Sequence, residues 1–253
     1  MITRNEVSNL PRSLPPLHWA GEIIVIDSFS SDGTVDFLHQ DSRIRIIQRE
    51  FTTFADQCSF GLEHVRTLWV LSLDADYCLT PEFIQELETL EPGNNDAFYA
   101  GFMFSIYGKL LRSSLYPPRI VLFKKGAIRY EDDGHGHHAV PLGSSADMKS
   151  RIIHDDRKSF SQWWVNQQNY ADQEATKLTE TRFRKLPLQD KLRKLIIPAS
   201  PAVAFYTLIW KLIILDGPKG WLYCLQRVIA EILLSLALIR KLLQSLQNRI
   251  LLS

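Results

Sequence analysis

The sequence predicts an α/β protein in which a mostly parallel sheet flanked by helices precedes an apolar helical tail. Short apolar, β-branched segments alternate with segments of helical pattern, which is typical of a parallel sheet. Two of the predicted strands end on a carboxylate, Asp27 and Asp74. Beyond residue 194 the chain becomes apolar and basic, which predicts helices outside the sheet domain.

The elements of the predicted sheet domain follow from their local patterns. The segment 22–27 is a continuous apolar run, as expected of a strand buried on both faces. A helix is predicted to begin after Thr80, because Thr80-Pro81-Glu82 combines an N-cap residue, a first-turn proline and a first-turn acid. Further strands are expected at 44–48, 68–73, 97–106 and 120–123, and further helices at 35–39, 54–64 and 159–178.

The tail contains two apolar stretches, 195–215 and 222–239, separated by 216–220. Pro198, Pro201 and Lys211 interrupt the first, and Glu231 lies in the middle of the second, which disfavours a clean transmembrane helix. Flanking tryptophans and many cations favour helices that lie in the membrane interface. The alternative is a helical hairpin packed on the domain or on a second copy of the chain, as a homo-oligomer.

Charge is distributed unevenly along the chain. Residues 182–253 hold 12 Lys and Arg against 3 Asp and Glu, whereas residues 1–181 hold 17 against 25, within a formal net charge of +1. The acidic body has no basic stripe, so nucleic acid is not an expected partner. The three cysteines are far apart and the first residues soon turn polar, so a reducing compartment and no signal peptide are expected. We expect a catalytic domain at 1–145, a helical linker at 146–194 and the tail at 195–253.

Asp74-Ala75-Asp76 directly follows the predicted strand 68–73. Ligand crevices in α/β sheets open at strand ends, and paired carboxylates there can bind Mg²⁺ or Mn²⁺ while leaving positions for phosphate oxygens. Such a cation offsets the charge of a departing diphosphate. A solvated turn is the alternative for an isolated Asp-x-Asp.

Two further polar segments accompany this pair. Asp27-Ser28-Phe29-Ser30-Ser31-Asp32-Gly33-Thr34 follows a buried strand, and its first carboxylate can accept hydrogen bonds from a nucleobase or ribose. An ordinary Asp/Ser/Gly turn is the other interpretation. Thr3-Arg4-Asn5-Glu6 is a polar cluster after a short strand.

The three segments, in this order and spacing, resemble the inverting family 2 glycosyltransferases with the GT-A fold, which is Rossmann-like. Among these, the chain is most similar to bacterial lipopolysaccharide-core and exopolysaccharide enzymes, over about the first 145 residues. The resemblance implies that Thr3, Glu6 and Asp27 line a nucleoside pocket, that Asp32 shapes its loop, and that Asp74 and Asp76 meet a metal-bound diphosphate.

The resemblance also implies partners and a location. A UDP-sugar donor, a lipid-linked or cell-envelope polysaccharide acceptor and a cytoplasmic position on the inner face of a bacterial membrane are expected. The helix before Asp74 carries Gln57-Cys58-Ser59 where related enzymes have a Gln-Arg-Asn-like triplet, so Arg49 is the nearest substitute for the basic diphosphate contact.

The segment 131–138 supplies three acids and three histidines. An inverting transfer needs a base to deprotonate the acceptor hydroxyl, and related enzymes carry it in a loop at this point. Asp132 is the favoured base, with Asp133 and His135 as alternatives, and His137 is a candidate ligand of the metal or diphosphate. His154 is a further candidate, because a histidine near this point in resembling enzymes can approach the diphosphate; a helix cap or surface turn is its other interpretation.

Two other functions remain compatible with the residues. A phosphohydrolase of the haloacid-dehalogenase type also uses Asp-x-Asp after an apolar strand, with Asp74 as nucleophile. A donor-binding fold that has lost catalysis could instead serve as a membrane-bound scaffold, because only Met1 and Ile2 precede Thr3 where the family has a longer first strand.

Overall fold

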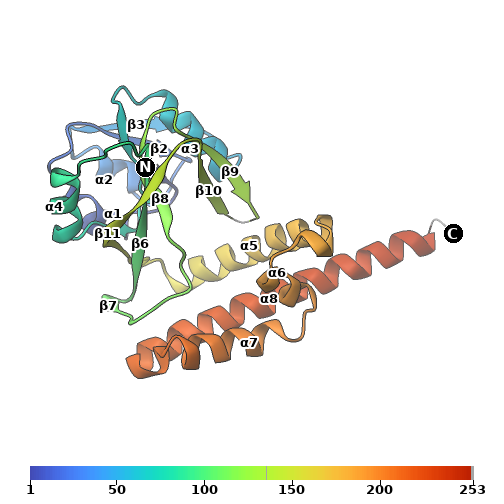
Figure 1. The fold of residues 1–253 in the computed structure, drawn as a ribbon. Helices are drawn as coiled ribbons and strands as arrows, with labels where there is room; N and C mark the ends of the chain where they lie inside the picture. Colours follow the sequence, from blue (N-terminus) through green and yellow to red (C-terminus); the bar gives the residue numbers. More distant parts are fainter. Residues whose placement is uncertain (135, 252–253) are drawn as a thin grey trace. The chain divides into compact units, whose positions relative to one another are not determined.

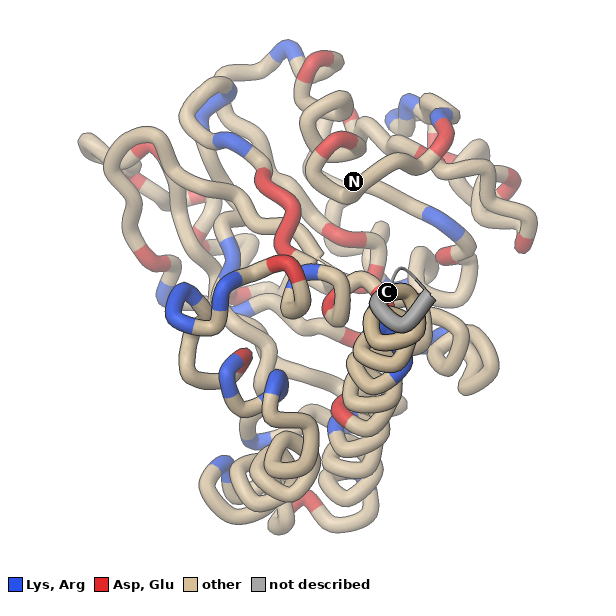
Figure 2. Tube along the Cα trace, turned by 90° about the vertical axis from the view of Figure 1, so that its right-hand side faces the viewer, with Lys and Arg blue, Asp and Glu red and all other residues tan. Residues whose placement is uncertain are grey.

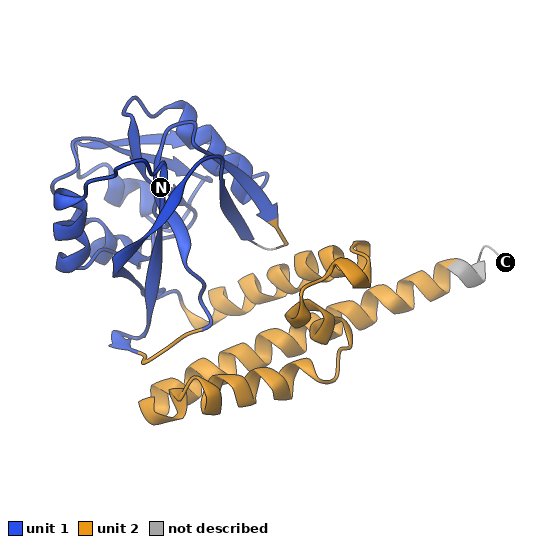
Figure 3. Cartoon of the chain, viewed as in Figure 1, with its two compact units in different colours: residues 1–110, 115–132, 136–158 blue, residues 111–114, 133–135, 159–253 orange. Residues whose placement is uncertain are grey.

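The computed structural model describes residues 1–134 and 136–251, which form two compact units (Figures 1 and 3). Unit 1 comprises residues 1–110, 115–132 and 136–158, and unit 2 comprises the other described residues. Unit 1 holds all the strands of the two main sheets, and unit 2 is helical. The α/β class is confirmed.

The first sheet of unit 1 is parallel and has the order β1-β2-β3, formed by β1 (Ile2–Thr3), β2 (Ile23–Asp27) and β3 (Ile44–Gln48). Its register aligns Thr3 with Asp27 and Asp27 with Gln48. The helices α2 (Thr34–Leu38) and α3 (Phe54–Glu63) follow β2 and β3 along the chain. The strands predicted at 22–27 and 44–48 are therefore confirmed.

The second sheet is mixed. Its order is β4 (Trp69–Leu71), β8 (Arg119–Lys124), β6 (Ala97–Ile106), β11 (Ser145–His154) and β5 (Tyr77–Cys78), and β7 (Lys109–Leu110) pairs with the end of β6. Only β6 and β11 run parallel; the other neighbours are antiparallel. A parallel bridge between Ile2 and Asp74 joins the two sheets.

A β-bulge interrupts the pairing of β8 with β6. Phe98 faces Leu122 and Tyr99 faces Ile120, so Val121 is an extra residue on β8. Val121 and Leu122 consequently belong to the same hydrophobic cluster although they are consecutive in a strand. On its other side β8 pairs with β4 in a regular register, Trp69 with Lys124, Val70 with Phe123 and Leu71 with Leu122.

The main core packs side chains from both sheets against short helices. These helices are α1 (Leu10–Ser13), the 3-10 turn η1 (Pro15–Leu17) and α4 (Pro81–Thr89). Leu10, Val25, Phe83 and Ile152 are fully buried in it. The hydroxyl of Thr80 accepts a hydrogen bond from the Phe83 amide at 3.1 Å, which confirms the predicted start of α4.

The acid- and histidine-rich segment is a hairpin rather than an irregular loop. Strand β9 (Ile128–Asp133) pairs with β10 (Gly136–Pro141) in a two-stranded sheet. His135 lies outside the described residues.

Unit 2 is built around two long helices, α5 (Phe160–Glu180) and α8 (Pro218–Leu251). Between them the chain forms η2 (Phe183–Lys185), α6 (Leu188–Lys194), α7 (Ala199–Phe205), the π-helical turn η3 (Tyr206–Trp210) and η4 (Ile213–Asp216). Ala175, Leu178, Leu234 and Leu238 form its core, with contributions from α5 and α8.

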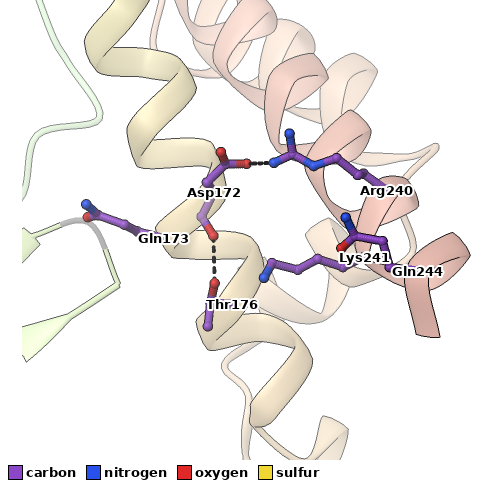
Figure 4. Close-up of a pocket in the computed structure, with 6 residues that line it drawn as sticks. All are labelled: Asp172, Gln173, Thr176, Arg240, Lys241 and Gln244. Atoms are coloured by element: carbon purple, nitrogen blue, oxygen red, sulfur yellow. Dashed lines mark hydrogen bonds and ion pairs between the residues drawn. The ribbon is translucent and has the colours of Figure 1, made fainter. Parts of the chain in front are cut away.

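The second apolar stretch of the tail is part of one 34-residue helix. Among the described residues, its portion from Pro218 to Asn248 is the one helix long and apolar enough to cross a membrane by length and composition. Glu231, in its middle, is bound by Arg193 at 2.8 Å. A shallow hollow of about 310 Å³ lies between α5 and α8, with polar walls that include Asp172, Arg240 and Lys241 (Figure 4).

Candidate functional site

Asp27 is a fully buried carboxylate at the end of β2. One oxygen accepts hydrogen bonds from the Thr3 hydroxyl at 3.2 Å and the Ser30 hydroxyl at 2.5 Å. The other accepts from the backbone amide of Ser30 at 3.0 Å and from the side-chain Nε2 of Gln48 at 3.3 Å. Asp27 therefore ties together the ends of all three parallel strands and the loop that follows β2.

The loop 27–34 and the segment 3–7 hold each other through complementary hydrogen bonds. Asp32 accepts from the Thr34 amide at 3.1 Å and from the Val7 amide at 3.2 Å. The Asn5 amide donates to the Ser30 hydroxyl at 2.8 Å. Gly33 adopts a φ of 89°, a left-handed conformation that glycine adopts without steric cost. The two polar segments predicted from the sequence at 3–6 and 27–34 are thus joined by hydrogen bonds.

Glu6 is bound by two residues that sequence reasoning missed. Its carboxylate forms an ion pair with Lys158 and accepts a hydrogen bond from the Asn9 side chain at 2.7 Å. Burial lowers the pKa of the Lys158 ammonium, but the charges of Glu6, Asp156 and Asp76 outweigh it and raise the pKa above its ordinary value. Lys158 is therefore a half-buried, charged partner of Glu6, from the segment that follows β11.

The carboxylate pair lies where the two sheets meet. Asp74 is bridged to Ile2, and Ile2 and Thr3 pair with the end of β2. Strand β1 is thus flanked by the segment that ends on Asp27 on one side and by Asp74 on the other. The structure therefore brings the two predicted strand-end carboxylates to neighbouring positions.

Asp76 is bound by His154 from the end of β11. Oδ2 of Asp76 lies 2.9 Å from Nε2 of His154. Burial alone would lower the pKa of His154, but the charge and hydrogen bond of Asp76 raise it; burial opposes ionisation of Asp76, and His154 lowers its pKa. The rings of Tyr77, Phe104 and Tyr116 surround the imidazole.

The second oxygen of Asp76, Oδ1, is buried without a hydrogen-bond partner. A buried carboxylate oxygen is costly unless something compensates it, and a hard divalent cation is suitable for that role. No group of three or more His, Cys, Asp or Glu side chains in the described part of the chain could hold a metal alone. Asp74 and Asp76 thus fit a cation that takes its other ligands from a bound phosphate and water.

Arg119, at the start of β8, is a further residue that sequence reasoning missed. One of its terminal nitrogens, Nη1, donates to the His137 carbonyl at 2.6 Å, and its guanidinium lies 5.2 Å from the centre of the Tyr116 ring. Its Nε is buried without a hydrogen-bond partner. No motif signalled it, because it stands in an ordinary strand.

The side chain of Arg49 binds residues of α3. Its guanidinium forms an ion pair with Asp56 at 2.8 Å, donates to the Gln57 side chain at 3.3 Å and lies 4.5 Å from the centre of the Phe60 ring. Arg49 is thus bound to α3 on several sides.

The residues of the β9–β10 hairpin have different surroundings. Asp132 is exposed and accepts a hydrogen bond from the Ala55 amide, in the first turn of α3, at 3.0 Å. Asp133, in unit 2, pairs with Lys177 at 2.6 Å. Nε2 of His137 lies 3.6 Å from the Cys58 sulfur, its ring is stacked on Phe54, and burial lowers its pKa.

Comparison with known proteins places the chain among sugar transferases. The family model described as glycosyl transferase family 2 matches residues 1–144. An uncharacterized glycosyltransferase of Rickettsia bellii is 27% identical over 107 residues, which is 42% of this chain and 36% of the relative. The lipopolysaccharide core biosynthesis glycosyltransferase LpsC of Rhizobium meliloti is 23% identical over 202 residues, 74% of each chain. The chain spans little more than a third of the rickettsial relatives' length.

Solved structures of similar shape include a mannosyltransferase and a protein bound to UDP-GlcNAc. The mannosyltransferase of Pyrobaculum calidifontis, solved with GDP-Man and Mn²⁺, has a TM-score of 0.49 and 15% identity over 93% of this chain and 85% of its own. S. aureus TarS 1–349, solved with UDP-GlcNAc, has a TM-score of 0.48 and 11% identity over 91% and 88%.

Proposed function

Because the chain belongs to glycosyl transferase family 2, we propose that it transfers a sugar from a UDP-sugar to an acceptor hydroxyl with inversion at the anomeric carbon. One observation carries the proposal. Asp27 and Asp74 come from distant parts of the sequence, and β1 brings them to neighbouring strand ends. Ligands of α/β sheets bind at such ends. Family membership also disfavours the phosphohydrolase alternative.

Asp74 and Asp76 would hold Mg²⁺ or Mn²⁺ in this proposal, and the cation would offset the charge of the leaving diphosphate. The unpartnered Oδ1 of Asp76 supports a cation at this place. His154 fixes the other oxygen and so limits the rotation of the carboxylate. The loops 3–7 and 27–34 would bind the nucleoside, with Asp27 holding them together.

Asp132 would act as the base. It is exposed, whereas Asp133 is neutralised by Lys177. A hydrogen bond from the Ala55 amide orients the Asp132 carboxylate while leaving it open to solvent. Asp132 would accept the proton of the acceptor hydroxyl as the oxygen attacks the sugar from the face opposite the leaving nucleotide.

The test is a screen of nucleotide sugars with membrane extract as acceptor. We expect transfer from a UDP-sugar, dependent on Mg²⁺ or Mn²⁺, and an anomeric configuration opposite to that of the donor. Thermal stabilisation by UDP with Mn²⁺, and none by simple phosphate esters, is the expected binding result. A product that keeps the donor's configuration would contradict the mechanism.

We further propose that the acceptor is lipid-linked or belongs to the cell envelope, and that unit 2 binds an anionic membrane surface. Exposed apolar residues recur along one face of α8 at helical spacing. These residues are Trp221, Leu225, Ile232, Leu236, Ile239, Leu243 and Leu246. Acidic and basic positions are sparse along α8 (Figure 2). The turn before α8 adds Ile209, Trp210 and Leu215, which are also exposed.

The charges of unit 2 favour an anionic lipid surface over a second copy of the chain. The three carboxylates after residue 181, those of Asp190, Asp216 and Glu231, are buried and paired with arginines. Cations such as Arg182, Arg184 and Lys185 remain exposed. An apolar face among uncompensated cations is typical of interfacial helices on anionic lipid, whereas two copies of this positive surface would repel each other.

Vesicle flotation tests this surface. The protein should float with vesicles containing phosphatidylglycerol and much less with pure phosphatidylcholine. Trp221→Glu combined with Leu236→Glu should abolish flotation, whereas Phe160→Glu, an equally exposed change on α5, should not. A lipid-free dimer that the double substitution converts to a monomer would show that a second copy covers this face instead.

A further inference from the structure

The candidate donor site has no basic residue where sequence reasoning expected one. Gln57 stands where related enzymes carry their triplet, and its amide binds the Ser28 hydroxyl at 2.9 Å. Arg49 is neutralised by Asp56, and Lys158 by Glu6. The negative charge of a leaving nucleoside diphosphate exceeds the charge of a single divalent cation, so a further cation at the site would stabilise it.

The pairing of β4 with β8 brings a different cation to the carboxylate pair. Trp69 faces Lys124, Val70 faces Phe123 and Leu71 faces Leu122, and the Ser72 amide donates to the Val121 carbonyl at 2.7 Å. Extrapolated by two further residues beyond Ser72, this antiparallel register places Arg119 opposite Asp74, and Asp74 is among the charges that act on the Arg119 guanidinium. Both residues lie in unit 1: Arg119 begins β8, and Asp74 lies three residues beyond the end of β4, the strand that pairs with β8.

The guanidinium of Arg119 is held in place but not neutralised by a contacting carboxylate. Its hydrogen bond to the His137 carbonyl and its position over the Tyr116 ring fix its plane. Within the part of the chain that the structure describes, no carboxylate lies within ion-pair distance of it. Burial lowers the pKa of Arg119, but Tyr116, Tyr77 and the charge of Asp74 raise it by more. A charged group with a buried, unpartnered Nε has remaining capacity to donate.

We propose that Arg119 binds the diphosphate of the donor, in the role for which Arg49 was expected. This inference rests on the proposed function and assigns a residue to it. A guanidinium can donate two parallel hydrogen bonds to phosphate oxygens, which suits a planar group already fixed by its neighbours. As the bond to the sugar breaks, negative charge grows on the phosphate oxygens, and Arg119 stabilises it.

Binding of uridine, UMP and UDP to the full chain, each with Mn²⁺, tests the proposal by calorimetry. Arg119→Met should weaken UDP binding by about 10- to 100-fold and leave uridine binding unchanged, since a charged hydrogen bond to phosphate is lost. Arg119→Lys, which keeps the charge and loses the fork, should fall between. Lys124→Met removes a cation from the same strand, where it pairs with Asp96, and should bind UDP like the unaltered protein.

Each other outcome has a defined meaning. If the unaltered protein binds UDP more tightly than uridine and both Arg119 variants do the same, the assignment of Arg119 is wrong while the proposed function stands. If Arg49→Met shows the loss instead, the original expectation from the sequence is correct. If the unaltered protein binds no nucleoside diphosphate, the proposed function fails and the inference fails with it. If Arg119→Met does not fold, Arg119→Lys tests the assignment, because it should still bind UDP more weakly than the unaltered protein.

Discussion

Nε2 of His154 lies 2.9 Å from Oδ2 of Asp76, while Oδ1 of the same carboxylate is buried without a partner. One oxygen is therefore used to orient the side chain, and the other remains available as a hard ligand. The contact joins the end of the long strand β11 to the Asp-x-Asp segment, beside the pairing of His154 with Tyr77.

Asp76→Asn should lower sugar transfer by at least about 100-fold, because loss of a metal ligand removes several kcal/mol of transition-state stabilisation. The isosteric amide keeps the shape of the side chain, so the fold should persist. The measurement is transfer rate together with thermal stabilisation by UDP with Mn²⁺. Full stabilisation of the variant by this mixture would argue against a cation at Asp76.

Asp132→Asn should lower the turnover number by about 10²- to 10⁴-fold with little change in donor binding, as expected for loss of a general base. Asp133→Asn is the matched control, because it is the next residue and its carboxylate is neutralised by Lys177. Steady-state kinetics of both variants distinguish them. A larger loss in Asp133→Asn would reverse the assignment.

Asp27→Ala should destabilise the fold by about 3 kcal/mol, because it leaves the buried Thr3 hydroxyl and the partly buried Ser30 amide without their acceptor. Urea unfolding of the chain measures the loss. Asp36→Ala, in the first turn of α2, is a control that removes an exposed carboxylate and should cost far less. Equal stability of the two variants would contradict a structural role for Asp27.

The contribution of Glu86 to stability should depend on pH. Its carboxylate accepts hydrogen bonds from the Lys149 and Ser150 amides at 2.8 and 2.7 Å, where β11 departs from regular pairing with β6. Burial raises the pKa of Glu86, but these hydrogen bonds outweigh it and hold the pKa below the ordinary value of 4.5. The stabilisation is therefore present above pH 4.5 and is lost as the pH falls through the lower, folded-state value.

Glu86→Ala should accordingly lower stability by about 1 kcal/mol at neutral pH, a modest figure because solvent screens a partly exposed group. The difference in melting temperature between variant and unaltered protein should shrink as the pH is lowered from 6 to about 3. Glu88→Ala, an exposed change on the same helix, is the control. If the difference in melting temperature did not vary with pH, the hydrogen bonds to Glu86 would stabilise the fold equally whether its carboxyl group is charged or neutral.

The sequence predicted the elements that carry a strong local pattern. The apolar run of β2 and the cap at Thr80 were sufficient to place a strand and a helix. Strand β11 was missed because its segment, Ser-Ala-Asp-Met-Lys-Ser-Arg-Ile-Ile-His, is largely polar and is held in the sheet by its neighbours. Local propensity gave no sign of it.

The candidate site was predicted where a motif marks it and missed where it depends on pairing. Asp27 and Asp76 stand in recognisable segments, but Lys158 meets Glu6 across 152 positions of sequence. Arg119 comes near Asp74 through the pairing of β8 with β4, which a single sequence does not reveal. The predicted roles of His137 and Arg49 remain predictions, and the structure binds both side chains to other partners.

Because of the bulge at Val121, the number of residues in β8 determines which of them faces Asp74. Removing that one residue would leave the hydropathy of the strand almost unchanged, yet it would advance the preceding residues by one place along β4. Pro118 would then stand opposite Asp74, and the guanidinium of Arg119 would turn to the other side of the sheet. A deletion of one residue between Arg119 and Phe123 would therefore move Arg119 out of register with Asp74. In an alignment or a redesign of this chain, such a deletion would alter function although the composition of the strand hardly changes.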